Sequence, residues 1–187
     1  MHEQMILTSR LILRPLSEED AGDLFEMLCN KDIYRFEPGE PISLDQAREI
    51  TLACSHDPAF WAVVLRAEQK MVGRLYFKQI KPEHLMTWEL GYIINPIYQN
   101  LGYASESALA LIQYGFSHLD VHRVVAYCSP DNIPSWRVME KIGMRREGTL
   151  KQNIYFKRNA LGNPAWQDSF AYGMLKEDIE SGSRKME

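Results

Sequence analysis

One short segment of the chain combines residue types that can hold an anion without a metal ion or a lysine. It reads Gln99-Asn100-Leu101-Gly102-Tyr103-Ala104 and lies between an apolar run at residues 88–94 and a helical pattern. The first turn of a helix has unpaired backbone N–H groups at the positive end of the helix dipole, and phosphate is stabilised there. Gly102 can adopt a positive φ and lets the backbone approach an anion closely. The segment, called the cradle below, therefore predicts an anion-binding turn.

The spacing of the glycines excludes two other kinds of phosphate site. A Walker loop requires G-x-x-x-x-G-K-[ST], which the sequence lacks. A dinucleotide-binding fold requires G-x-G-x-x-G in a parallel βαβ unit, and here only one glycine flanks Tyr103. By itself the cradle leaves two interpretations open, an anion site and an ordinary strand-to-helix connection.

Alternating strand and helix patterns must position the cradle. Ser17 and Ser43 are expected to cap helices that run to Leu28 and to about Cys54. Strands are expected at residues 10–16, 59–65, 71–80, 88–94, 123–128, 144–150 and 168–175, with further helices at residues 104–119 and 134–142. Gly73 is a predicted bulge, and Gly115 indicates close packing of its helix on the sheet. This order predicts the α/β class in one domain.

The composition narrows the classes of partner. The 187 residues carry a net charge of -4, with 45% hydrophobic and 25% charged residues, which gives no support to a nucleic-acid-binding face. The three cysteines form no C-x-x-C pair and the histidines show no H-x-x-x-H spacing, so no metal site is expected. No apolar run is long enough to span a bilayer, and no signal-peptide pattern occurs. We therefore expect a cytoplasmic protein with no nucleic-acid or membrane partner.

Several segments together resemble one family. Gln99-x-x-Gly102-x-Ala104 resembles the Q/R-x-x-G-x-G/A signature of the GCN5-related N-acetyltransferases, the GNAT family. Matching segments follow the family's order: Thr8 to Leu16, Val72-Gly73, Glu89-Leu90-Gly91-Tyr92, Asn132-x-x-Ser135, Glu140 to Met144 and Glu147-Gly148. Trp166-x-Asp168 resembles the RimJ/RimL branch of ribosomal-protein N-terminal acetyltransferases. The resemblance covers residues 8–179, the core of a single domain of residues 1–187.

The resemblance implies a GNAT fold. Its mixed, mostly antiparallel central sheet is splayed between two parallel strands, here at residues 88–94 and 123–128, with flanking helices. Acetyl-CoA, the acetyl donor, would lie in the gap, with its pantetheine on the backbone of Tyr92 and Ile94. Gln99, Asn100, Leu101, Gly102, Tyr103 and Ala104 would hold the pyrophosphate. Asn132 would bond the pantetheine arm, and Ser135 would lie near the sulfur.

Acetyl transfer to an amine requires a neutral amine and a protonated leaving thiolate. Glu89 is the predicted base, against the alternative of a strand-edge carboxylate in solvent or paired with an arginine, and Glu147 and His84 are weaker candidates. Ser135 is the predicted hydrogen-bond donor to the thiolate, against the alternative of a serine that satisfies a helix end. Relatives carry a tyrosine acid one helical turn further on, where this chain has Met139. An acetyl–Cys128 intermediate is less favoured than a buried structural thiol.

The sequence thus predicts an acetyl-CoA-dependent N-acetyltransferase that works by direct attack in a ternary complex. The acceptor is expected to be a protein N-terminal α-amine or a small-molecule amine, and the protein a monomer or homodimer. Met139 keeps open a non-catalytic acyl-CoA-binding or regulatory module of the same fold. A nucleotide-binding protein that uses the same turn is the third alternative.

Overall fold

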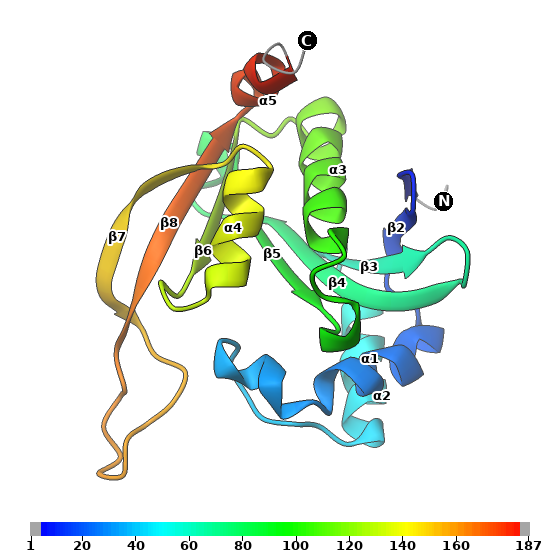
Figure 1. Ribbon diagram of the computed structural model, residues 1–187, viewed down its shortest axis with the longest axis vertical. Helices are drawn as coiled ribbons and strands as arrows, with labels where there is room; N and C mark the ends of the chain where they lie inside the picture. The colour runs from blue at the N-terminus through cyan, green and yellow to red at the C-terminus, as the bar shows by residue number, and fades with distance from the viewer. Residues whose placement is uncertain (1–4, 184–187) are drawn as a thin grey trace.

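The computed structural model describes residues 5–183 and shows an eight-stranded sheet flanked by helices (Figure 1). The strands are β1 (Ile6–Leu7), β2 (Leu11–Pro15), β3 (Phe60–Leu65), β4 (Lys70–Gln79), β5 (Thr87–Ile94), β6 (Arg123–Cys128), β7 (Arg145–Ile154) and β8 (Gln167–Leu175). They lie in the order β1-β2-β3-β4-β5-β6-β8-β7. Neighbouring strands are antiparallel except β5 and β6, which are parallel. The predicted α/β class and mostly antiparallel sheet are confirmed.

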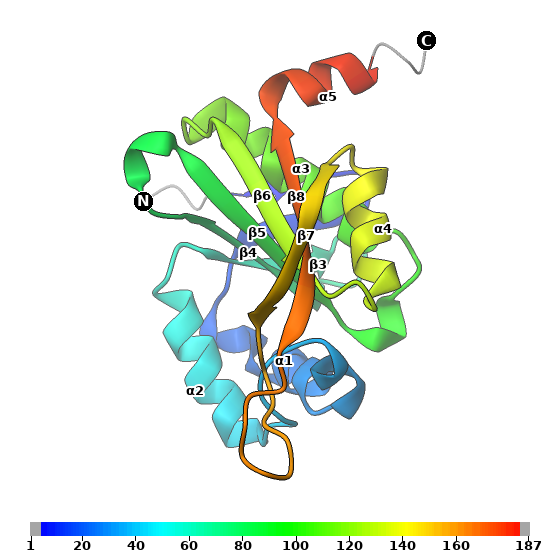
Figure 2. The same cartoon turned by 90° about the vertical axis from the view of Figure 1, so that its left-hand side faces the viewer.

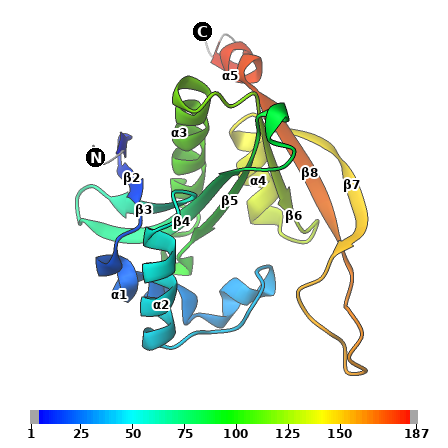
Figure 3. The ribbon, with the colours of Figure 1, turned by 180° about the vertical axis from the view of Figure 1, so that it is seen from behind.

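The helices cover both faces of the sheet. They are α1 (Ala21–Leu28), α2 (Leu44–Ser55), α3 (Tyr103–His118), α4 (Ile133–Lys141) and α5 (Lys176–Ser183). Residues of α3 and α4 pack into one buried cluster with the strands, and residues of α1 and α2 pack into a second. Figure 3, seen from behind, shows α1 and α2 on the side of the sheet opposite to α3 and α4.

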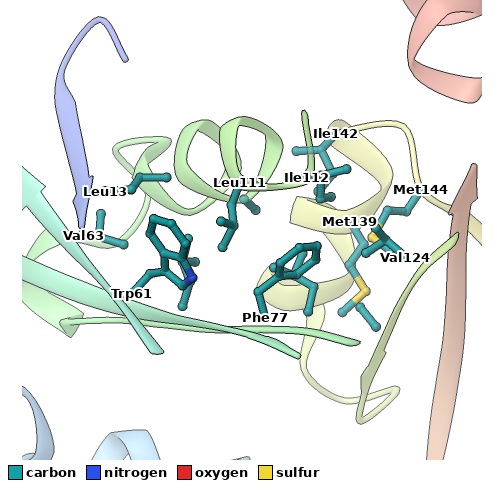
Figure 4. Close-up of a cluster of buried hydrophobic side chains, with 14 of the residues drawn as sticks. Leu13, Trp61, Val63, Phe77, Leu111, Ile112, Val124, Met139, Ile142 and Met144 are labelled. Atoms are coloured by element: carbon teal, nitrogen blue, oxygen red, sulfur yellow. The ribbon is translucent and has the colours of Figure 1, made fainter. Parts of the chain in front are cut away.

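The larger core cluster anchors α3 against the middle of the sheet (Figure 4). Trp61 and Phe77 rise from the strands towards Leu111 and Ile112, and all four side chains are buried. A Cβ atom on Gly115 would lie 2.7 Å from the ring of Phe77. The predicted close packing at Gly115 is therefore confirmed, and it fixes the height of α3 above the sheet.

The two predicted capping residues have different outcomes. Ser43 accepts from the N–H of Gln46 at 3.3 Å, and the Gln46 side chain accepts from the N–H of Ser43 at 2.8 Å, which confirms the capping box of α2. The helix expected directly after Ser17 begins later, because Glu18–Asp20 form a 3₁₀ turn and α1 starts at Ala21. Tightened turns of this kind are common at helix starts.

β4 has a bulge at Val72, next to Gly73, where the bulge was predicted. The pairing of β3 with β4 skips Val72, since Val63 faces Gly73 and Val64 faces Met71. A Cβ atom on Gly73 would lie 2.6 Å from the carbonyl oxygen of Ile93. The glycine therefore allows β4 and β5 to approach closely, next to the part of β5 that faces the gap.

The gap between the two parallel strands is the feature that matters most for function. Thr87, Trp88 and Glu89 pair with the first three residues of β6, and the pairing stops there. Beyond Glu89 the strands diverge, as Figure 1 shows, while β5 stays paired with β4 up to Ile94. The predicted splay is confirmed, with its closed end at Glu89.

Three elements differ from expectation. β7 runs to Ile154, beyond the predicted end at residue 150, and its exposed length lacks the alternation that marks a half-buried strand. The short edge strand β1 and the polar helix α5 had no prediction. Figure 2 shows α5 at the end of β8, far from α1 and α2. None of these differences alters the gap.

Candidate active site between the diverging strands

The cradle has the geometry that its glycine predicted. Gly102 is the N-cap of α3 with a φ of 83°, and as a glycine it has no side chain to cap the helix. Asn100, two residues earlier, also has a positive φ of 61°. These two residues with positive φ turn the chain so that the N-terminus of α3 can receive an anion.

Arg10, at the entrance to β2, ties the cradle to the rest of the fold. Its guanidinium donates to the carbonyl oxygen of Leu101 at 2.9 Å and to the carboxylate of Glu106 at 2.7 Å. It also lies over the ring of Tyr103, 4.6 Å from the ring centre. The sequence predicted a strand and a family resemblance here, but no contact with the cradle. In the structure, Arg10 braces both the turn and the first turn of α3.

A cavity of about 690 Å³ extends from the cradle along the gap. Gln99, Asn100, Gly102, Tyr103 and Ala104 line it, together with Tyr92 and Ile94 of β5 and Asn132 and Ser135 of α4. Leu101 is half-exposed and does not line it, and its carbonyl is held by Arg10. We call this space the cradle cavity. It brings together every predicted donor-site residue except Leu101.

Three cationic side chains near the cradle were not predicted as site residues. Arg35, Arg137 and Lys141 line the cradle cavity, the last two one helical turn apart on α4. Arg137 and Lys141 fit the solvent-facing side of the amphipathic helix α4, so their sequence pattern did not indicate a binding role. A phosphate-bearing ligand of the cradle cavity would meet these positive charges as well as the backbone amides.

Asn132 and Ser135 form the start of α4. The Asn132 side chain accepts from the N–H of Ser135 at 3.3 Å, so its oxygen caps the helix. The hydrogen bonds of Ser135 fit both its predicted role and the structural alternative. Its hydroxyl lies 3.1 Å from the phenol oxygen of Tyr92, across the gap.

The sequence predicted a role only for the backbone of Tyr92, but in the structure its phenol also belongs to the site. Its hydroxyl donates to the carbonyl oxygen of Ser135 at 2.7 Å. Burial raises the pKa of Tyr92 well above its ordinary value, so the phenol stays protonated. Met139, at the position of the family's tyrosine, is 2% exposed and packs in the core (Figure 4). A phenol is thus present near Ser135, and it comes from β5 instead of α4.

A second cavity, of about 320 Å³, lies on the other side of Tyr92. Because Glu89 and Glu37 line it, we call it the carboxylate cavity. Burial raises the pKa of Glu89 above its ordinary value. The predicted base is therefore half-buried and faces a cavity, and in residues 5–183 no ion pair joins it to an arginine; its role as the base stays a prediction.

The two cavities meet at a common wall. The residues that line both are Phe36, Glu37, Tyr92, Ile93, Asn132 and Ser135. A molecule in the cradle cavity and one in the carboxylate cavity would therefore face each other near Tyr92 and Ser135.

The weaker sequence candidates lie elsewhere or are unreactive. Glu147 is ion-paired with Arg123, and His84 is exposed in a 3₁₀ turn; neither lines the two cavities. Cys128 does line the carboxylate cavity, but burial raises its pKa to about 11. The thiolate needed for an acetyl–Cys128 intermediate is therefore disfavoured.

Among residues 5–183 no cluster of three or more potential metal ligands occurs. In the same residues no helix is long and apolar enough to cross a membrane.

Comparison with known proteins gives a consistent result. The family model described as "Acetyltransferase (GNAT) domain" matches residues 10–145. YnaD of Bacillus subtilis (strain 168), named an uncharacterized N-acetyltransferase, is 38% identical over 174 residues, with 92% of this chain and 98% of YnaD covered. Spermidine N(1)-acetyltransferase of Escherichia coli (strain K12) is 25% identical over 153 residues, covering 80% of this chain and 82% of that enzyme.

A solved structure extends the likeness to three dimensions. The acetyltransferase (GNAT family) from Bacillus anthracis is 35% identical, and the superposition has a TM-score of 0.84. It covers 93% of this chain and 99% of the other.

Proposed function

Because this chain belongs to the GNAT family and is an N-acetyltransferase, we propose that it transfers the acetyl group of acetyl-CoA to a primary amine by direct attack in a ternary complex. The observation that carries the proposal is the common wall of the two cavities at Tyr92 and Ser135. A donor and an acceptor bound on either side would have their reacting atoms adjacent, which removes the need for a covalent enzyme intermediate.

The cradle cavity suits the donor. The free amides of Gly102, Tyr103 and Ala104 at the start of α3 would bind the pyrophosphate, and Arg137 and Lys141 would add positive charge. Tyr92, Ile94 and Asn132 lie along the gap, where the pantetheine would run. We propose Gln99 as a positioning residue, because its amide donates to the carbonyl oxygen of Ile94 at 3.0 Å and ties the cradle to β5.

The carboxylate cavity suits the acceptor. At neutral pH an amine with an ordinary pKa is mostly ammonium, so a carboxylate must bind the cation and help to remove a proton. Glu89 is the residue that the sequence predicted for this task. The acceptor is a small-molecule amine or a protein N-terminal α-amine. The RimJ/RimL branch suggests the α-amine, and the spermidine N(1)-acetyltransferase relative acts on a polyamine.

The leaving thiolate needs a hydrogen-bond donor on the same wall. We propose that Ser135 supplies it, supported by the neutral phenol of Tyr92 at 3.1 Å. The non-catalytic alternative was based on the missing phenol at Met139 and on the uncertain base, and the phenol of Tyr92 near Ser135 argues against the first of these reasons. We also propose a cytoplasmic location and a monomer or homodimer.

Thiol release measured with acetyl-CoA and a panel of acceptors tests the proposal. The panel should include spermidine, an aminoglycoside and short peptides with free N-termini. We expect acceptor-dependent thiol release and an acetylated amine by mass spectrometry. Stabilisation by CoA without thiol release on any acceptor would contradict it, and stabilisation by ATP alone would favour a nucleotide-binding protein.

A further inference from the structure

Glu37 is a half-buried carboxylate for which no role was predicted from the sequence. It follows the 3₁₀ turn Lys31–Arg35 and belongs to the segment before α2. It lines both the cradle cavity and the carboxylate cavity, whereas Glu89 lines only the latter. Figure 1 shows the segment that carries it passing below the open end of the gap.

Among residues 5–183, several acidic side chains of the fold are held by protein partners, whereas Glu37, like Glu89, is not. Asp20 is bonded by Arg14 at 2.7 Å, and Glu106 by Arg10 at the same distance. Within the described part of the chain, Glu37 has no hydrogen bond and no ion pair. A carboxylate removed from water without a partner is costly, which is expected where a ligand supplies the missing partner.

The surroundings of Glu37 are rich in ionisable groups. Arg74 of β4 and Tyr92 of β5 are near enough to interact with it electrostatically. Other ionisable groups that line the same two cavities are Asp32, Arg35, Tyr76, Glu89, Tyr98, Tyr103, Tyr127, Cys128, Arg137, Lys141 and Asp168. Burial raises the pKa of Glu37 to about 7, against the opposing effect of Arg74.

We infer that Glu37 is a catalytic residue that takes the proton of the acceptor's ammonium group at the wall between the two cavities. The inference rests on the proposed acetyl transfer. One N–H proton of the ammonium passes to the Glu37 carboxylate, and the nitrogen lone pair forms the N–C bond with the thioester carbonyl carbon. The C–S bond then breaks, and the electron pair leaves on sulfur. A second proton from the nitrogen reaches the sulfur to give CoA thiol, and Glu37 returns its proton to water.

The position of Glu89 explains why Glu37, and not Glu89, receives this role. Glu89 pairs with Val125 at the closed end of the gap, three residues before Tyr92. From there it can hold positive charge at the inner end of the carboxylate cavity. Of these two glutamates, only Glu37 also lines the cradle cavity, in which the thioester would lie.

The pH dependence of kcat/KM for the best acceptor of the panel tests the inference. The variants are Glu37→Gln and Glu89→Gln, with Glu40→Gln as a matched control on the same segment, exposed and outside both cavities. In the unchanged protein, kcat/KM is expected to rise as the pH increases through about 7. Glu37→Gln should lose this rise and at least about 100-fold in kcat/KM at pH 8. Glu40→Gln should match the unchanged protein, and Glu89→Gln should keep the rise and mainly increase KM.

The outcomes distinguish the inference about Glu37 from the proposed acetyl transfer. If the rise survives in Glu37→Gln, or disappears in Glu89→Gln, the inference about Glu37 is wrong although acetyl transfer stands. If the unchanged protein acetylates no amine, the proposed function and the inference both fail. Misfolding is not expected, because the neutral glutamine removes a desolvated charge. Thermal unfolding and acetyl-CoA binding of Glu37→Gln at pH 8 check this, and Glu37→Asp should recover part of the rate.

Discussion

The phenol of Tyr92 on β5 donates a hydrogen bond of 2.7 Å to the carbonyl oxygen of Ser135 on α4. These residues are 43 positions apart, and their contact bridges the strand and the helix on the two sides of the gap. Both residues line the cradle cavity and the carboxylate cavity. The bridge therefore sets the place where donor and acceptor would meet.

Replacing Tyr92 by phenylalanine should lower kcat with little effect on the KM for acetyl-CoA. The lost phenol hydrogen bond corresponds to about 1–3 kcal/mol of transition-state stabilisation, or about 10- to 100-fold in rate. Steady-state kinetics of Tyr92→Phe measure this. Tyr155→Phe is the control, since Tyr155 packs on Trp166 outside both cavities. An unchanged kcat in Tyr92→Phe would show that the phenol has only a structural role.

Placing an aspartate at Gly102 should abolish binding of acetyl-CoA. The substitution puts a negative charge in the cradle and strains a backbone whose φ is 83°. Isothermal titration with CoA measures the affinity. Gly162→Asp provides a matched control, because Gly162 has a φ of 80° and lies outside both cavities. Equal CoA affinity in the two variants would refute the donor site.

Removing the guanidinium of Arg10 should weaken CoA binding at a distance. In Arg10→Ala the carbonyl of Leu101 loses its side-chain donor and the carboxylate of Glu106 loses one of its several donors, so the cradle is less ordered. We expect the Kd for CoA to rise about tenfold, which corresponds to about 1.4 kcal/mol. Arg48→Ala, which breaks an exposed pair with Asp45, should leave the Kd unchanged. A similar Kd in both variants would mean that the cradle does not depend on this brace.

Replacing Cys128 by alanine should leave catalysis nearly intact. With its pKa raised to about 11, the thiol is protonated at neutral pH and does not act as a nucleophile. Rapid mixing with acetyl-CoA in the absence of acceptor should produce no acetylated protein by intact mass. A stoichiometric acetyl adduct that is lost in Cys128→Ala would instead support a covalent route.

The parts of the site that could be predicted from the sequence depend on local rules. Gly102 was identified because a turn before a helix favours a residue that tolerates positive φ, and Ser43 because a capping box requires a serine followed by Gln46. Glu89 was placed correctly on the strand that forms one side of the gap.

The remaining parts depend on contacts between distant residues. Arg10 and Leu101 are 91 positions apart, and nothing in the local pattern of either predicts their hydrogen bond. Glu37 lies in a segment without periodicity, so its burial could not be inferred. The phenol of Tyr92 reaches Ser135 only because α4 starts beside the open end of the gap.

The proposed reaction requires donor and acceptor to meet directly at the wall formed by Tyr92 and Ser135. Initial velocities measured while acetyl-CoA and the best acceptor are varied together test it most directly. We predict double-reciprocal lines that intersect, because both molecules must be bound before either product leaves. Parallel lines, which indicate a covalent acetyl-enzyme, would contradict the account.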